Sequence, residues 1–309
     1  MKKIILISCI TFLCATSCLS QNNDKFVSLF NGKDLTNWTL DKPSGFEVVD
    51  GELITKDFGV GNLFYTKKWY GNFILRLEYM LSEKGDCGVF IRRKPSDQLA
   101  AFEVQLLAPW TPRRDDLHCT GSLFGHVAVT NRPDETTGVW HKIEIKCDRN
   151  IITVSVDDKV TTMANIDTVK TLVNKPFVGV IGLQGNHAIK QGQFEKYRNI
   201  YIRDFDAEPD YVLNGFYEKN DQLRNLALDA AVNLGAEMLQ PLADLMSGDN
   251  PVAKNGARQA LFDIVAKASD PGASKRGKKE VTVALRRCMN SASSEITKNY
   301  LKWLSGMIN

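Results

Sequence analysis

Residues 73–81 read FILRLEYML, and their alternation decides the fold. Apolar residues occupy every second position with Arg76 and Glu78 between them, so an extended strand buries one side and keeps the other polar. Runs of the same kind, bounded by Gly, Asn and Asp, continue through residues 25–206. They are CGVFIRR (87–93), AFEVQLL (101–107), HKIEIKC (141–147), NIITVSVDD (150–158), FVGVIGLQ (177–184) and RNIYIRDF (198–205). No helical period separates them, which predicts a two-sheet, all-β sandwich of jelly-roll type.

The pattern changes after residue 207, where apolar residues recur three or four positions apart. In DQLRNLALDAAVNLG (221–235) this spacing predicts an apolar helix face that ends at the final glycine. RNLALDAA (224–231) and KNGARQAL (254–261) align at an offset of 30, which indicates stacked helix pairs of the HEAT or armadillo kind. Residues 210–309 are therefore expected to form a smaller all-α domain. It is either a docking surface for a protein partner or a stabilising appendage.

The N-terminus has the features of a bacterial export signal. Lys2 and Lys3 precede an apolar stretch over residues 4–15 that is too short to span a bilayer as an anchor. Small residues then lead to Cys18, which resembles the site where a lipoprotein precursor is cleaved and lipidated. We expect residues 1–18 to be a lipoprotein signal peptide and the protein to be exported, periplasmic or on the cell surface, and held at the membrane by a lipid anchor. Plain secretion with cleavage nearby is the alternative.

Composition limits the partners and the chemistry. Of 309 residues, 43% are hydrophobic and 24% charged, which suits a globular chain of two domains. Lys and Arg number 39 against 36 Asp and Glu, without a basic stretch interleaved with aromatics, so nucleic acid is not an expected partner. The sequence has no H-E-x-x-H, G-x-S-x-G, P-loop or C-x-x-C pattern, which argues against a zincin, an α/β hydrolase, a nucleotide-triphosphate enzyme and a structural zinc cluster. Cys87 and Cys119 are a candidate disulfide.

Polar residues embedded in the predicted strands are the candidate site. Arg76 and Glu78 share one side of their strand, as Glu103 and Gln105 do of theirs. Alternation in CGVFIRR predicts that Arg92 lies on the same side as Phe90 and that Arg93 lies on the side of Val89 and Ile91. If these strands are neighbours, a carboxylate, a guanidinium and an amide converge on one concave surface. A solvated sheet face is the other interpretation of the same pattern.

These residues belong to a series of motifs that resembles the 3-keto-disaccharide hydrolase family, once described only as a bacterial domain of unknown function. The series covers roughly residues 26–205. It consists of LFNGKDLTNW (29–38), DGEL (50–53), F-x-L-x-x-E-Y (73–79), GVFIR (88–92), FEVQ (102–105), TGSLFG (120–125), GVWHK (138–142), IGLQGNH (181–187) and RNIYI (198–202). The resemblance implies a concanavalin A-like jelly roll. This chain departs from the family in having Asp86, Cys87 and Gly88 where N-S-G is usual, and Asn186-His187 where His-Gly is usual.

The resemblance also implies cleavage of 3-keto-glycosides or 3-keto-disaccharides. A ketone at C3 acidifies the C2 hydrogen, so a base can form an enolate that expels the glycosidic oxygen from C1, with or without later addition of water. Glu103 is then the expected base or metal ligand, His187 a base or acid, and Arg92 the cation beside the enolate oxygen. Gln105, Gln184, Glu78 and His118 are expected to bind substrate. No cofactor is certain, a divalent metal is possible, and a non-catalytic carbohydrate-binding lipoprotein is the competing interpretation.

Overall fold

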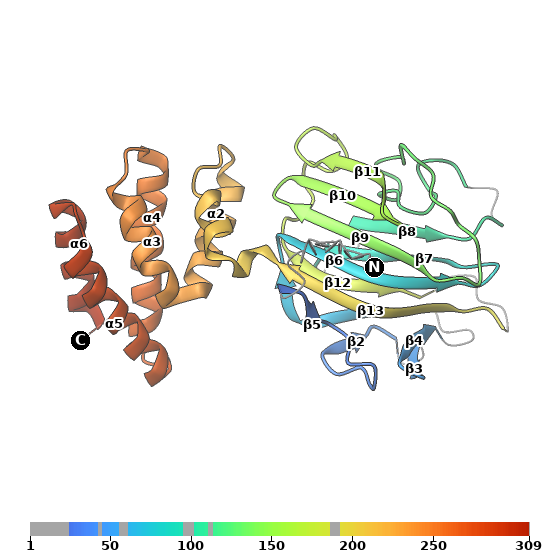
Figure 1. Ribbon diagram of the computed structural model, residues 1–309, viewed down its shortest axis with the longest axis horizontal. Helices are drawn as coiled ribbons and strands as arrows, with labels where there is room; N and C mark the ends of the chain where they lie inside the picture. The colour runs from blue at the N-terminus through green and yellow to red at the C-terminus, as the bar shows by residue number, and fades with distance from the viewer. Residues whose placement is uncertain are drawn as a thin grey trace, which may run out of the picture.

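The computed structural model describes residues 25–42, 45–55, 61–94, 102–110, 114–185 and 192–308. A sandwich of two antiparallel sheets is followed by helices that extend away from it (Figure 1). This confirms the predicted jelly-roll sandwich with a smaller all-α domain. The predicted signal peptide with Cys18, and His187, lie outside the described residues. Within the described ranges, no helix combines the length and apolar character needed to cross a membrane.

The larger sheet has eight strands in the order β11-β10-β9-β6-β13-β4-β3, with β1 beside β13. They are β1 (Val27–Ser28), β3 (Phe46–Val49), β4 (Glu52–Thr55), β6 (Phe73–Leu81), β9 (His141–Asp148), β10 (Ile151–Val156), β11 (Lys159–Asn165) and β13 (Glu195–Asp204). In β6 and β9 every second residue is fully buried while the residues between are partly or fully exposed. The larger sheet therefore has one side in the core and one side in water.

The smaller sheet has five strands in the order β2-β5-β12-β7-β8. They are β2 (Trp38–Leu40), β5 (Asn62–Tyr70), β7 (Asp86–Arg93), β8 (Phe102–Leu107) and β12 (Gly179–Gln184). All six residues of β12 are buried, and in β7 only the first residue is not. Both sides of the middle of this sheet are therefore withdrawn from solvent, unlike those of the larger sheet.

The chain after β8 continues the smaller sheet beyond its last strand. Leu123 forms a β-bridge with Val104, and the backbone of Gln105 exchanges hydrogen bonds with Gly121 and Ser122. This pairing satisfies the backbone of β8 on its outer edge, so the strand that contains Glu103 is held on both sides.

The candidate disulfide between Cys87 and Cys119 is not formed, because both are free, buried thiols. Cys87 lies in the core between the sheets, where its sulfur accepts a hydrogen bond from the Tyr197 hydroxyl at 3.1 Å. Cys119 lies in the loop after β8, with Sγ 3.9 Å from the carbonyl of Asp116. One thiol thus lies in the core between the sheets and the other in a loop, so the predicted disulfide is wrong.

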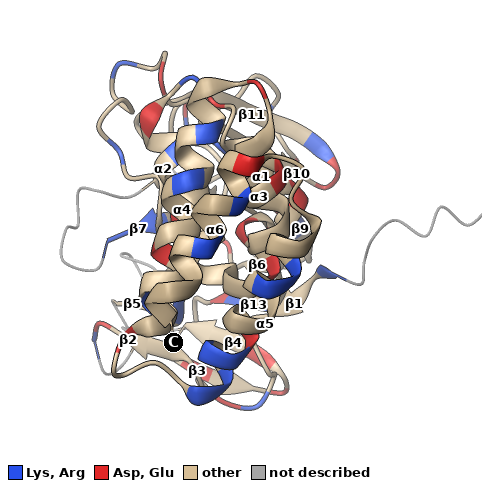
Figure 2. Cartoon of the chain, turned by 90° about the vertical axis from the view of Figure 1, so that its left-hand side faces the viewer, with Lys and Arg blue, Asp and Glu red and all other residues tan. Residues whose placement is uncertain are grey.

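The helical domain is a stack of helix pairs. After η2 (Phe205–Ala207) and α1 (Pro209–Gly215) come α2 (Asp221–Leu234), η3 (Gly235–Met238), α3 (Leu239–Ser247), α4 (Pro251–Ser269), α5 (Lys275–Ser291) and α6 (Glu295–Ile308). The two sequence segments that align at an offset of 30 lie in α2 and α4, which pack together, and α4 also packs against α6. Since α3 packs against α5 in the same way, the arrangement is HEAT-like. Figure 2 looks along this stack, with the C-terminal helices in front of the sandwich.

Candidate functional site

Polar side chains gather on the outer side of the smaller sheet, which is turned away from the core. We refer to this surface as the Glu103 face. It consists of Asn62, Asp86, Glu103, Gln105 and Gln184, which alternate with the core residues Leu63, Cys87, Val104, Leu106 and Leu183. The pairing of β7 with β8 sets Gly88 opposite Gln105 and Phe90 opposite Glu103, and that of β5 with β12 sets Asn62 opposite Gln184. The structure thus brings together three predicted site residues, Glu103, Gln105 and Gln184.

The absence of a side chain at Gly88 determines where the Glu103 carboxyl lies. A Cβ built on Gly88 would be 2.7 Å from Cγ and from Oε1 of Glu103. The Glu103 side chain therefore leans over the backbone of β7 into space that any other residue would fill. From there it reaches β12, where it is hydrogen-bonded to the side chain of Gln184.

Burial is the main influence on the charge of Glu103. Burial raises the pKa of Glu103 to about 7, and the nearby Asp86 carboxylate also raises it. The hydrogen bond with Gln184 and the positive charge of Arg93 lower this pKa but do not offset the increase. Near neutral pH the carboxyl is thus divided between its acid and base forms, which suits a group that accepts and returns a proton.

Gln105 is fixed by Asp86. The Gln105 side chain is 2% exposed, and its Nε2 donates to Oδ1 of Asp86 at 2.9 Å. This bond orients the amide and keeps the Asp86 carboxylate on the same face as Glu103. Asp86 was not among the predicted site residues, although the alternation of β7 places it on the side of Phe90.

The predicted position of Arg92 is wrong. Arg92 has a left-handed backbone, with φ of 51°, and its side chain is fully buried away from Glu103. Its Nε donates to the carbonyl of Gly71 and its Nη2 to that of Arg149, both at 2.9 Å. Arg92 therefore ties together turns at one end of the sandwich, and this placement does not support a catalytic role.

Arg93 lies where Arg92 was expected. The left-handed residue interrupts the alternation of β7, and the pairing with β12 shifts register between Val180 and Gly182. As a result the guanidinium of Arg93 lies over two rings on the outer side, with Cζ 4.4 Å from the centroid of Phe90 and 4.8 Å from that of Phe64. Arg93 is 7% exposed, and its Nε is buried without a hydrogen-bond partner in the described part of the chain.

An exposed aromatic ring borders the Glu103 face. The backbone N–H of Phe124 donates to the carbonyl of Glu103 at 2.9 Å, and the residue is 43% exposed. The predicted ligand residue His118 packs edge-on against this ring, with centroids 4.9 Å apart, and its Nδ1 is 2.8 Å from Oδ1 of Asp115. His118 therefore supports the exposed ring of Phe124 at the rim, and its own role in substrate binding stays a prediction.

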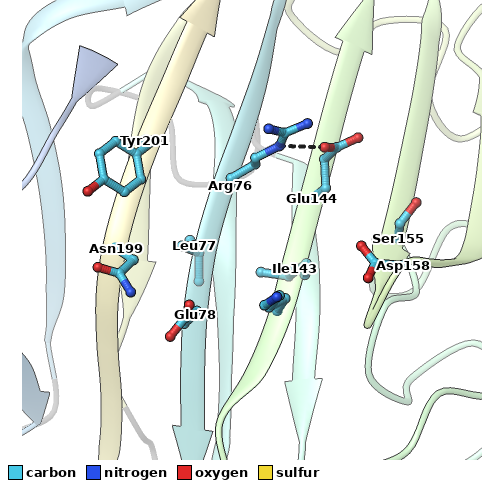
Figure 3. Close-up of a pocket in the computed structure, with 10 residues that line it drawn as sticks. Arg76, Leu77, Glu78, Ile143, Glu144, Ser155, Asp158, Asn199 and Tyr201 are labelled. Atoms are coloured by element: carbon cyan, nitrogen blue, oxygen red, sulfur yellow. Dashed lines mark hydrogen bonds and ion pairs between the residues drawn. The ribbon is translucent and has the colours of Figure 1, made fainter. Parts of the chain in front are cut away.

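Glu78 lies on the larger sheet, so the prediction that it lies near Glu103 is wrong. Alternation set the side chain on the polar side of β6 as expected, but β6 pairs with β9 and β13 rather than with β7. There it helps to line a groove of about 680 Å³, where Arg76 and Glu144 are paired (Figure 3). Glu78 itself accepts from Nε of Arg198 at 2.7 Å. This groove thus holds opposite charges that already neutralise one another.

The described residues contain no cluster of three or more His, Cys, Asp or Glu side chains that could hold a metal ion. Around Glu103 the neighbours are amides, one carboxylate and an arginine. Carboxylate and amide oxygens are ligands that divalent cations accept, so the divalent metal stays a prediction. His187, the predicted second proton-transfer group, stays a prediction.

Comparison with known proteins agrees with this fold. Residues 25–203, more than half of the chain, match the family described as a 3-keto-alpha-glucoside-1,2-lyase-like domain. None of the curated proteins is a significant match.

Two solved structures from Parabacteroides distasonis, both provisionally described as glycosyl hydrolases, are similar to this chain. The first is 25% identical with a TM-score of 0.51, and the match covers 58% of this chain and 99% of that one. The second is 17% identical with a TM-score of 0.50, covering 59% and 94%. The second likeness shows the fold alone.

Proposed function

The chain belongs to the 3-keto-alpha-glucoside-1,2-lyase-like domain family of carbohydrate-active proteins, and on that premise we propose that it cleaves the glycosidic bond of 3-keto-glycosides or 3-keto-disaccharides. The observation that carries the proposal is Glu103, a carboxyl with its pKa raised to about 7 by burial in the middle of a polar sheet face. A base with this pKa can remove a proton that a neighbouring ketone has acidified.

In the proposed reaction Glu103 takes the proton from C2. The C–H electron pair forms a C2=C3 double bond, and the C3 carbonyl oxygen becomes an enolate oxygen. Return of that charge re-forms the ketone, makes a C1=C2 double bond and breaks the C1–O bond. The leaving oxygen takes up a proton from water, and Glu103 gives the C2 proton back to the solvent, so that the carboxylate is restored. The product is an enone, to which water can add, so that the overall reaction is either elimination or hydrolysis.

Substrate contacts are available on both sides of Glu103. Gln184 and Asn62 lie opposite one another on β12 and β5, where the amide of Gln184 is bonded to Glu103 and Nδ2 of Asn62 donates to Asp41. Each amide has further hydrogen-bonding capacity that suits sugar hydroxyls. Phe124 provides an exposed ring at the rim, and aromatic faces pack well against the C–H faces of sugars. We expect the sugar that carries the ketone to lie over Gly88 and the leaving group toward Phe124.

A non-catalytic carbohydrate-binding lipoprotein is the second candidate. The exposed ring of Phe124 beside a row of amides favours it, because binding a native glycan needs only these groups. It gives no role to the raised pKa of Glu103, since a sugar hydroxyl is bound by an ordinary ionised carboxylate. We therefore rank it second.

The test is incubation of the purified protein with a panel of 3-keto-glucosides and 3-keto-disaccharides and their unoxidised parents, with and without added divalent metals. We expect release of the aglycone and an enone absorbance from the 3-keto compounds only. Intact 3-keto substrates throughout the panel, together with binding of native glycans, would replace the enzyme by the second candidate.

We also propose that the protein is an exported lipoprotein anchored through Cys18. The support is the sequence of residues 1–18. Labelled palmitate should be incorporated into the full-length protein in a bacterial host and should be lost in Cys18→Ser. Equal labelling of the two would contradict the anchor.

A further inference from the structure

The guanidinium of Arg93 is buried against aromatic rings rather than paired in an ion pair with a described carboxylate. Two phenylalanine rings lie beneath its guanidinium, and they come close together because Gly182 has no side chain, since a Cβ there would lie 2.6 Å from the ring of Phe64. The rings attract a positive charge but offer it no hydrogen-bond acceptor. Arg93 is 7% exposed, and its Nε has no hydrogen-bond partner among the described residues, although the carboxylates of Asp41 and Glu103 are close enough to act on its charge. The guanidinium thus has a donor that the described residues do not use.

The position of Arg93 relates it to Glu103. Phe90, one of the two rings, is the register partner of Glu103, and the charges of Arg93 and Glu103 influence each other. A ligand over this part of the sheet thus meets a base on one side and a guanidinium on the other. Removal of a proton from a carbon beside a carbonyl needs this pair, because the electrons from the C–H bond collect on the carbonyl oxygen.

We propose that Arg93 binds the C3 carbonyl oxygen of the substrate and stabilises the negative charge that develops on it when Glu103 removes the C2 proton. This inference rests on the proposed function. It assigns to Arg93 the recognition of the oxidised position, since a C3 hydroxyl in the unoxidised sugar cannot accept the charge. The low exposure of the guanidinium strengthens its effect, because little water screens it.

The experiment compares Arg93→Met and Arg93→Lys with the matched control Arg198→Met. Arg198 also lies over an aromatic ring, with Cζ 3.9 Å from the centroid of Trp140, but it is on the opposite sheet. Two readouts are measured on a 3-keto-glucoside, namely aglycone release and exchange of the C2 hydrogen with deuterium from solvent. Circular dichroism and thermal unfolding identify variants that fail to fold.

We expect Arg93→Met to lower kcat for both readouts by about a hundredfold or more, the scale of losing one oxyanion-stabilising group. Arg93→Lys keeps the charge without the fork of donors, so it should be intermediate, and it decides the question if Arg93→Met does not fold. Arg198→Met should stay within about threefold of the wild type.

Folded Arg93→Met and Arg93→Lys proteins that both exchange and cleave within about threefold of the wild type would overturn the inference, and the proposed function would still stand if Glu103→Gln were inactive. A wild-type protein that neither exchanges C2 nor releases the aglycone removes the proposed function and this inference together.

Discussion

The outer faces of the two sheets both contain a glutamate and an arginine, but these residues differ between the faces in their burial and in their partners. On the larger sheet, Glu78 is partly exposed and bound to Arg198, whose side chain is 37% exposed. On the smaller sheet, Glu103 is bound to an amide, while Arg93 lies over two rings. Exposed charges that are already hydrogen-bonded in an ion pair change little when a ligand arrives, whereas buried charges that are near opposite charges but not paired with them can act on a ligand. We therefore base the proposed site on the burial and the partners of these groups rather than on their presence alone.

Replacing the carboxyl on each face tests this difference most directly. Glu103→Gln is expected to lower kcat on a 3-keto-glucoside by more than about a hundredfold, because it removes the base while preserving shape. The matched variant Glu78→Gln should stay within about threefold. Equal effects of the two substitutions, measured as aglycone release, would mean that Glu103 has no special role.

Gly88→Ala should have the next largest effect. The added methyl group meets the flexible end of Glu103 at 2.7 Å, so the carboxyl must move away from Gln184 while the backbone can remain in place. We expect a loss of about tenfold or more in kcat with a small change in unfolding temperature. An alanine variant with full activity would show that the carboxyl does not act from its position over Gly88.

The charge of Asp86 should move the pH profile. Activity requires the ionised form of Glu103, so it should rise with pH to a half-maximum near 7, the raised pKa. Asp86→Asn removes a negative charge, which makes ionisation of Glu103 easier and lowers its pKa. The profile of kcat against pH should therefore shift to lower pH, by about half a unit to one unit. A shift to higher pH, or none, would contradict this coupling.

The smallest effect is expected for the ion pair on the larger sheet. Glu78→Gln should change the free energy of unfolding by less than about 1 kcal/mol, since partly exposed ion pairs contribute little. Denaturant unfolding of the two proteins in low and high salt measures it. A loss of several kcal/mol would show that this face stabilises the fold strongly.

Alternation in the sequence was enough to predict the sandwich and the polar side of β8 with Glu103 and Gln105. Gln184 was expected at the site only from the resemblance to the family. Alternation could not assign β6 to a sheet, because pairing is decided by contacts between strands far apart in the chain. The strand β5 was not predicted either, since Thr66, Lys67, Lys68 and Trp69 are all exposed and interrupt its apolar pattern.

No feature of the sequence could have predicted that Arg93, rather than Arg92, lies on the side of Phe90. Left-handed backbone is usually recognised by a glycine or asparagine, and here an arginine adopts it because two carbonyl groups and a buried position hold its side chain. Asp86 could have been found, since it shares the alternation of Phe90. Phe124 could not, because its place at the rim depends on the loop that pairs with β8.

The left-handed turn at Arg92 also has a consequence for how this site can evolve. Two neighbouring residues have separate positions: Arg92 holds one end of the sandwich, and Arg93 lies on the outer side of the smaller sheet beside the Glu103 face. Substitution at position 92 would act mainly on the amount of folded protein, whereas substitution at position 93 would act mainly on the proposed reaction. Relatives with the same scaffold and new substrates should therefore differ at 93 while they keep 92.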